Sequence, residues 1–72
     1  MVQKNIKLRK DEEYITLGVL LKIAGIIDTG GQAKYFLSKN VVLVNDEEDN
    51  RRGRKLYHGD KIQVQGQLFL ID

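Results

Sequence analysis

The sequence has no cysteine, no proline and no tryptophan, and it contains a single histidine, His58. Without cysteine, neither a disulfide framework nor a thiolate metal site can supplement the core. With one histidine and no cysteine, no Ser/His/Asp or Cys/His catalytic constellation can be assembled, and no second histidine is present to share a metal. We therefore expect no enzyme, no metal site and no cofactor, and we interpret His58 as a surface turn residue.

Long apolar runs are also missing. No stretch approaches the length of a membrane span, and no apolar signal region follows Met1. Seventy-two residues suffice for one domain, residues 1–72, whose stability is modest because a chain of this size buries only about 60% of its unfolded surface. These features predict a cytoplasmic monomer that does not bind a membrane.

The charges that are present are segregated along the chain. Twelve Lys and Arg residues against ten Asp and Glu residues give a net charge of +2. An acidic run, Asp46, Glu47, Glu48 and Asp49, immediately precedes a basic cluster, Arg51, Arg52, Arg54 and Lys55. The local field steers a charged partner, and it decays over roughly 8 Å at physiological salt. The basic cluster thus predicts a site for a polyanion, and the alternative is that both runs are solvated loops. The acids lack the alternating ligands and glycine of a calcium loop.

The first half of the chain predicts a strand and a helix. The strand is Asn5–Leu8, in which Ile6 and Leu8 share a face. Thr16 can cap the helix, and Gly25 can end it in the left-handed conformation. The apolar positions of this helix follow the i, i+3, i+4, i+7 spacing: Leu17, Leu20, Leu21 and Ala24.

A second helix is predicted after Thr29. Thr29 as N-cap and Gln32 three residues later form a capping box. The inward stripe is Ala33, Phe36 and Leu37, and we expect Phe36 to lie inside, between this helix and the sheet. Asn40 is expected to end the helix in the left-handed conformation, because its short side chain tolerates positive φ.

Strands dominate the remainder. The pattern predicts strands over Val41–Val44, from about Lys55, over Lys61–Gln65 and over Gln67–Ile71. The connections are a turn around residues 45–50, a tight turn at residues 57–60 and a turn at Gly66. The fold class is therefore α+β, with two short helices packed on a small, mostly antiparallel sheet.

Four signatures in this order resemble a known family. They are Leu17-x-x-Leu20-Leu21-x-x-Ala24-Gly25-Ile26, Thr29-Gly30-x-x-Ala33-Lys34, Val42-Leu43-Val44-Asn45 and Gly59-Asp60-x-Ile62. Together they resemble the RNA-binding domain named after small-subunit ribosomal protein S-four, also called the alpha-L motif. The motif spans about residues 16–64, flanked by strands 5–8 and 67–71. The run from Arg51 to Leu56 looks like the small stand-alone bacterial members of the family.

The resemblance implies an RNA-binding surface formed by the start of the second helix, its basic side and the loop after the first hairpin strand. Together with the basic cluster, the candidate RNA-binding residues are Thr29, Gly30, Gln32, Lys34, Lys39, Asn45, Arg51, Arg52, Arg54 and Lys55. Two positions depart from the family pattern. Gly30 and Gly31 follow Thr29 where members often have arginine, and Asn45-Asp46 replaces the usual Asn-Gly turn.

The expected function is non-catalytic binding of structured RNA, ribosomal or transfer RNA, through phosphate and shape contacts. The implied setting is translation, with the ribosomal subunit as a candidate partner. Tyr35 and Tyr57 are candidates for stacking on an unpaired base, and the alternative is that both half-bury against the sheet. A protein–protein adaptor that uses the basic face on an acidic partner is the alternative function, because charge alone does not distinguish the two partners.

Overall fold

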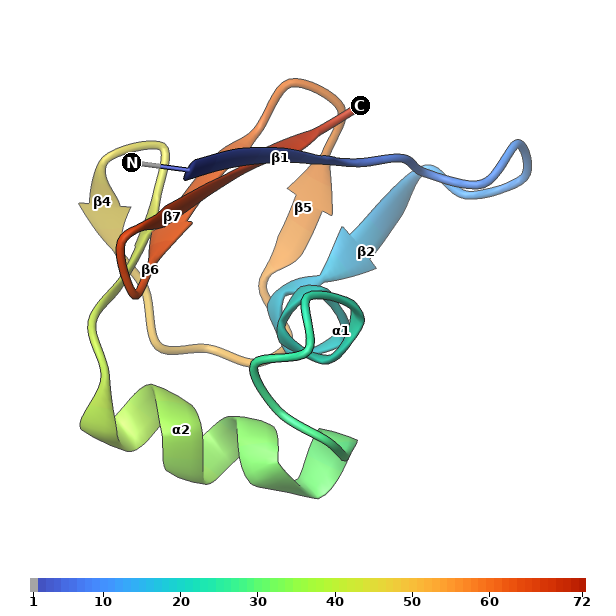
Figure 1. Ribbon diagram of the computed structural model, residues 1–72. Coiled ribbons are helices and arrows are strands. Elements are labelled where there is room, and N and C mark those ends of the chain that lie inside the picture. The colour runs from blue at the N-terminus through green and yellow to red at the C-terminus, as the bar shows by residue number, and fades with distance from the viewer. Residues whose placement is uncertain (1) are drawn as a thin grey trace.

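The computed structural model describes residues 2–72 and has the predicted α+β architecture (Figure 1). These residues form strands, two short α-helices and a 3₁₀ turn. In chain order the elements are β1 (Val2–Ile6), β2 (Tyr14–Thr16), α1 (Leu17–Ile23), the 3₁₀ turn (Gly30–Gln32), α2 (Ala33–Lys39), β3 (Val42–Val44), β4 (Glu47–Glu48), β5 (Lys55–Tyr57), β6 (Lys61–Val64) and β7 (Gln67–Ile71).

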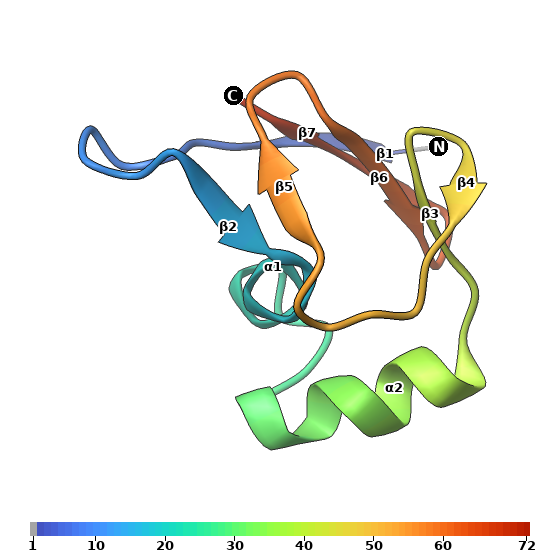
Figure 2. The ribbon, with the colours of Figure 1, turned by 180° about the vertical axis from the view of Figure 1, so that it is seen from behind.

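Five of the strands form one sheet in the order β1-β7-β6-β3-β4. β6 pairs antiparallel with both β7 and β3, and β3 pairs antiparallel with β4, whereas β1 is parallel to β7. The mostly antiparallel sheet is therefore confirmed. β2 and β5 form a separate antiparallel ribbon. In Figures 1 and 2, α2 lies along one side of the molecule and the strands on the other, with α1 between α2 and the ribbon.

The core draws on the helices, the ribbon and the sheet. Its fully buried side chains are Leu17, Leu20, Leu21, Val42, Val44, Leu56, Ile62, Phe69 and Ile71. The buried aromatic ring belongs to Phe69, whereas Phe36 is only partly buried and packs against the edge of this core. The prediction for Phe36 was wrong because Ala33 and Leu37, one turn apart, define the inward stripe of α2. Phe36 lies beside that stripe.

Local signals set the ends of α1 as predicted. The Thr16 hydroxyl accepts a hydrogen bond from the Val19 N–H at 3.4 Å. Gly25 adopts φ +75°, and its N–H donates to the Lys22 carbonyl at 3.1 Å. Within residues 2–72, no helix is long and apolar enough to cross a membrane.

The capping box at the start of the second helix is present. Gln32 Oε1 accepts the backbone N–H of Asp28 at 2.6 Å and that of Thr29 at 3.2 Å. The reciprocal half is weaker, because the Gln32 N–H donates to the Thr29 carbonyl at 3.1 Å and the Thr29 side chain makes no full capping hydrogen bond. The shortest hydrogen bond of this cap is therefore one that the Gln32 side chain accepts.

Two boundaries differ from the prediction. Asn40 has φ −131° and is not left-handed; its Nδ2 instead donates to the Phe36 carbonyl at 3.0 Å. The first strand is Val2–Ile6 rather than residues 5–8, because pairing with β7 sets its extent. Leu8 follows the strand, and its N–H donates to the Asp72 carbonyl at 3.1 Å.

The hairpin turn after β3 is tighter than the predicted turn over residues 45–50. Asn45 and Asp46 have φ of 52° and 69°, and β4 begins directly afterwards. Two consecutive positive φ values are the geometry of the hairpin turn that Asn-Gly usually forms, and Asn and Asp tolerate this region better than most residues. The Asn-Asp pair therefore preserves the turn.

Candidate nucleic-acid interface

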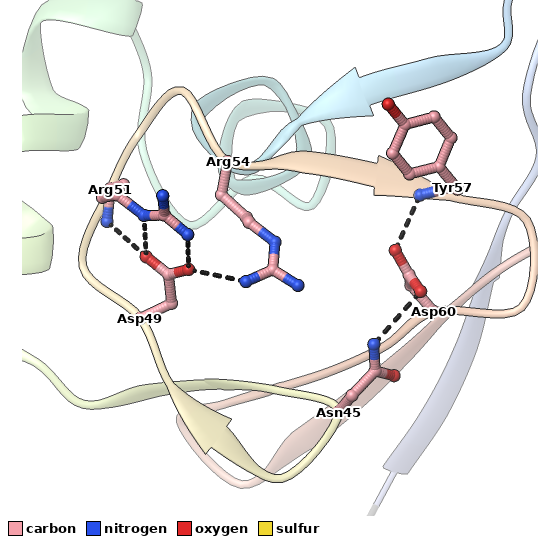
Figure 3. Close-up of polar contacts among 6 residues, drawn as sticks. All are labelled: Asn45, Asp49, Arg51, Arg54, Tyr57 and Asp60. Carbon is pink, nitrogen blue, oxygen red and sulfur yellow. Dashed lines mark hydrogen bonds and ion pairs between the residues drawn. The ribbon is translucent and has the colours of Figure 1, made fainter.

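The loop between β4 and β5 is organised around one buried carboxylate. Asp49, the last acid of the acidic run, is only 9% exposed. Its Oδ1 accepts the Arg51 backbone N–H at 2.9 Å and Arg51 Nε at 3.1 Å. Its Oδ2 accepts Arg51 Nη2 and Arg54 Nη1, both at 2.9 Å (Figure 3). We call Asp49, Arg51 and Arg54 the arginine clasp.

The hydrogen bonds between Asp49 and Arg51 favour the charged forms of these two side chains. The side-chain hydrogen bond from Arg51 holds the pKa of Asp49 well below its ordinary value, although partial burial opposes the shift. The hydrogen bond with Asp49 in turn raises the pKa of Arg51. At neutral pH the clasp thus presents two guanidinium groups against one carboxylate.

Both arginines of the clasp keep part of their guanidinium group available for a further partner. The Arg51 side chain is 69% exposed and that of Arg54 is 30% exposed. Within the described residues, Arg51 Nη1 and the Nε and Nη2 atoms of Arg54 make no hydrogen bond to the protein. Each guanidinium is therefore fixed at one edge and still has N–H groups for an external acceptor.

Arg52 lies on a different side of the loop, against both helices. Its carbonyl accepts the Gly18 N–H at 2.9 Å, and the Arg54 carbonyl accepts the Leu17 N–H at 2.8 Å. A Cβ at Gly18 would lie 3.4 Å from the Arg52 carbonyl oxygen and 3.5 Å from the Ala33 Cβ, so glycine allows this close approach. The backbone of the basic cluster is therefore fixed to the start of α1.

A shallow groove connects Arg52 to the beginning of the second helix. The groove is lined by Thr16, Gly18, Val19, Gly30, Ala33, Arg52 and Gly53. The fold thus brings together Gly30 and Arg52, which are far apart in the sequence. A second open hollow lies on the clasp side and is lined by Arg51, Gly53, Arg54, Lys55, Tyr57 and Asp60.

The other candidates on the second helix are more dispersed. Thr29, Lys34 and Lys39 are exposed. Lys39 Nζ lies 5.9 Å from the centroid of the Tyr35 ring, near the far end of α2. The Gln32 side chain is engaged in the capping box, so the role that its contacts show is structural.

Asn45 also has a structural role. Its Nδ2 donates to Asp60 Oδ1 at 3.1 Å, and its Oδ1 accepts the Lys61 N–H at 3.0 Å. Asp60 Oδ2 accepts the Tyr57 N–H at 2.8 Å, as the right side of Figure 3 shows. These bonds tie the β3–β4 turn to the tight turn between β5 and β6. Binding of RNA by Asn45 stays a prediction.

Two contributors to this surface were missed in the sequence. Asp49 was read only as part of an acidic run, although its position two residues before Arg51 permits the local side-chain-to-backbone bond that forms. Tyr14 belongs to β2, a strand that was not predicted. Among the described residues, no group of three or more His, Cys, Asp or Glu side chains could hold a metal ion.

Comparison with known proteins agrees with this architecture. The family model described as "S4 domain" matches residues 6–72. The probable ribosome maturation protein RlbA of Bacillus subtilis (strain 168) is 62% identical over 56 residues, which cover 78% of this chain and 79% of that protein. The resemblance carried by the four signatures is thus confirmed, and with two helices packed on a mostly antiparallel sheet the chain belongs to the S4 domain family.

Proposed function

We propose that this protein is a non-catalytic RNA-binding module that docks on structured ribosomal or transfer RNA through phosphate and shape contacts. Its cellular setting is then the cytoplasm, and its role is in translation or in ribosome maturation. The observation that carries the proposal is the basic loop, fixed by the arginine clasp on one side and by the start of α1 on the other.

The fixed loop suits a phosphate backbone. Arginine presents a planar fork that matches two phosphate oxygens, and holding one edge of the fork on Asp49 reduces the rotamer entropy that binding would otherwise cost. Arg52 is exposed, has no ion pair within the described residues and lines the same groove as Gly30, so its charge is available to an external anion. Phosphate contacts fix orientation without reading sequence, which suits recognition of folded RNA by shape.

Family membership and the printed name of the relative support the same setting. The S4-type domain implies structured RNA as the ligand, and the relative is named a probable ribosome maturation protein. We therefore propose ribosomal RNA as the first candidate ligand and transfer RNA as the second, and we propose that the protein binds as a monomer.

A salt titration tests the proposal. Each phosphate neutralised by a cation adds roughly 0.7–0.9 to the slope of log affinity against log salt. Arg52→Ala should lower this slope by about that amount for many structured RNAs and should leave the melting temperature unchanged, because its side chain makes no ion pair within residues 3–72. Lys10→Ala, which removes an exposed cation from the loop after β1, is the matched control and should leave the slope nearly unchanged.

Replacing Arg51, Arg52 and Arg54 together would change the stability of the fold as well as its affinity for RNA. Without Arg51 and Arg54, Asp49 would remain as a buried carboxylate without its partners, so stability would fall together with affinity. For this triple variant we expect the slope of log affinity against log salt to fall by about two units, and the Tm must be measured together with it. Arg52→Lys should restore the slope but not all of the affinity, because an ammonium cannot make the two-pronged contact.

A pull-down from a cell lysate distinguishes RNA from an acidic protein. The expected result is recovery of structured RNA that ribonuclease removes. Ribosomal sequences should be more abundant in this RNA than in the RNA recovered with the Arg52→Ala protein. If protein partners persist after ribonuclease treatment and no purified ribosomal or transfer RNA shows salt-dependent binding, the basic face serves a protein and the proposal is wrong.

A further inference from the structure

The outer face of the β2–β5 ribbon carries an aromatic and cationic surface. Register pairs Tyr14 with Tyr57, Ile15 with Leu56 and Thr16 with Lys55. Because Ile15 and Leu56 are buried, the alternating side chains on either side of them face outward. The two tyrosines are 38% and 46% exposed, respectively.

The two rings form a directly opposed pair. Their centroids are 5.7 Å apart, and the ring planes are inclined by 49°. Lys55 Nζ lies 5.1 Å from the centroid of the Tyr14 ring, so Tyr14 is partly occupied by its neighbours. Tyr57 is the more open ring, and it also lines the hollow on the clasp side.

That hollow combines an aromatic surface with fixed positive charge. Arg51, Arg54 and Lys55 line it together with Tyr57. Asp60 also lines the hollow, and hydrogen bonds from Asn45 and the Tyr57 N–H fix its carboxylate there, so the lining carries three cations and one anion. A tyrosine ring flanked by cations is the arrangement on which an unpaired base stacks while its phosphates are neutralised.

We infer that Tyr57, supported by Tyr14, holds one unpaired nucleobase, while Arg54 and Lys55 contact the phosphates on either side of it. This inference rests on the proposed RNA-binding function and names the RNA feature recognised: a bulged or looped-out nucleotide beside a helix. Tyr35 shares only part of the arrangement: Lys39 Nζ lies 5.9 Å from its ring centroid, but the described residues that line its hollow include no cation. It is 70% exposed on α2, and the hollow it lines has mainly apolar and uncharged polar walls with Asp28 as its charged member.

Three RNA hairpins of the same stem separate base stacking from phosphate contact. One carries a single unpaired 2-aminopurine, the second carries an abasic ribose at that position, and the third is fully paired. The abasic hairpin retains the bulge backbone and its phosphates, so the affinity ratio between the first two reports on the base alone. The parent protein should bind the 2-aminopurine hairpin on the order of 5- to 100-fold more tightly than the abasic one, and the fluorescence should change as the base stacks.

Variants then identify the ring. Tyr57→Leu retains an apolar side chain on the ribbon and should reduce the ratio to about one, whereas Tyr57→Phe should preserve it because stacking uses the ring and not the hydroxyl. Tyr35→Leu is the matched control and should leave the ratio unchanged. The Tm of each variant is measured as well, because the opposed tyrosines also stabilise the ribbon.

The outcomes separate this inference from the function on which it rests. If the parent binds all three hairpins equally, or if Tyr57→Leu keeps the parent ratio, the base site is wrong while salt-dependent binding of the paired hairpin still supports RNA binding. If no hairpin binds, both proposals fail. Loss of a ribonuclease-resistant protein partner in Tyr57→Leu, with the RNA ratio unchanged, would assign the surface to a protein and overturn the inference.

Discussion

The arginine clasp makes a specific prediction for Asp49→Asn. Asparagine can still accept the Arg51 backbone N–H, but its amide group would then face Arg51 Nη2 and Arg54 Nη1, which are themselves donors. A hydrogen bond to a charged group contributes about 1.5–3 kcal/mol when it is well shielded. Because Arg51 is 69% exposed, water replaces part of the loss, and we expect a cost of about 1–3 kcal/mol in the free energy of unfolding.

Such a loss is large for a small domain. It corresponds to a fall of roughly 5–20 °C in Tm, which thermal unfolding followed by circular dichroism would measure. Glu47→Gln is the matched control, since Glu47 is exposed on β4 and its side chain has no ion pair within residues 3–72. We expect the control to melt close to the parent.

Acid provides an independent check of the same clasp. The pKa of Asp49 is depressed in the folded protein, so the unfolded state takes up the proton first as the pH falls. The stability that ionised Asp49 contributes is therefore complete above its ordinary pKa of about 4 and is lost progressively at lower pH. The difference in unfolding free energy between the parent and Asp49→Asn should therefore shrink as the pH falls from about 5 to about 2.

RNA binding gives the third readout. Removing one negative charge beside the arginines favours RNA by roughly 1 kcal/mol or less near the surface, whereas freeing two arginine side chains costs about 0.5–1.5 kcal/mol each when they must be ordered again. We therefore expect a weaker affinity together with an equal or steeper salt slope. An Asp49→Asn protein with the parent's Tm, acid sensitivity and affinity would refute the reasoning on the clasp.

Two further predictions concern the fold. Phe69→Ala should cost on the order of 3–5 kcal/mol in chemical denaturation, and the half-buried Phe36→Ala clearly less; equal losses would contradict the core assignment. Gln32→Ala should destabilise by about 1 kcal/mol, and Thr29→Ala by less, because Gln32 makes the short capping bonds; the opposite order in thermal unfolding would show that the Thr29 hydroxyl dominates.

Local chemistry accounts for the parts of the fold that the sequence predicted well. Thr16 and Gly25 delimit α1 through contacts within a few residues, and the alternation of Val42 and Val44 needs only the pleat of a strand. The strands from Lys55 onward are separated by turns with glycine at positive φ, at Gly59 and Gly66. These features need no knowledge of distant residues.

The features of the fold that the sequence did not predict depend on residues far away in the chain. β2 has only three residues, and it is a strand because β5 lies beside it, about forty residues later in the chain. The extent of β1 is likewise set by its parallel pairing with β7. Phe36 and Phe69 are both large and apolar, and only the packing of the sheet against the helices determines which ring is enclosed.

The candidate site likewise depends partly on local sequence and partly on distant contacts. The charge pattern located the basic cluster, the family resemblance pointed to the helix start, and the fold then brought Arg52 and Gly30 to one groove. Neither the pattern nor the resemblance indicated that Asp49 would be buried against Arg51 and Arg54, because a run of four acids gives no sign of which carboxylate turns inward.

The structure divides the acidic run into separate roles. Asp46 lies in the hairpin turn, where Gln63 Nε2 approaches its Oδ1 at 3.4 Å, and Glu47 and Glu48 form β4 at the edge of the sheet. Exposed charge on an edge strand opposes pairing with another chain. Among the described residues, Asp49 is the acid that forms ion pairs with the basic cluster. The net charge of +2 therefore includes acids that protect a sheet edge, and the field that an RNA would meet is set by the guanidinium groups around the clasp.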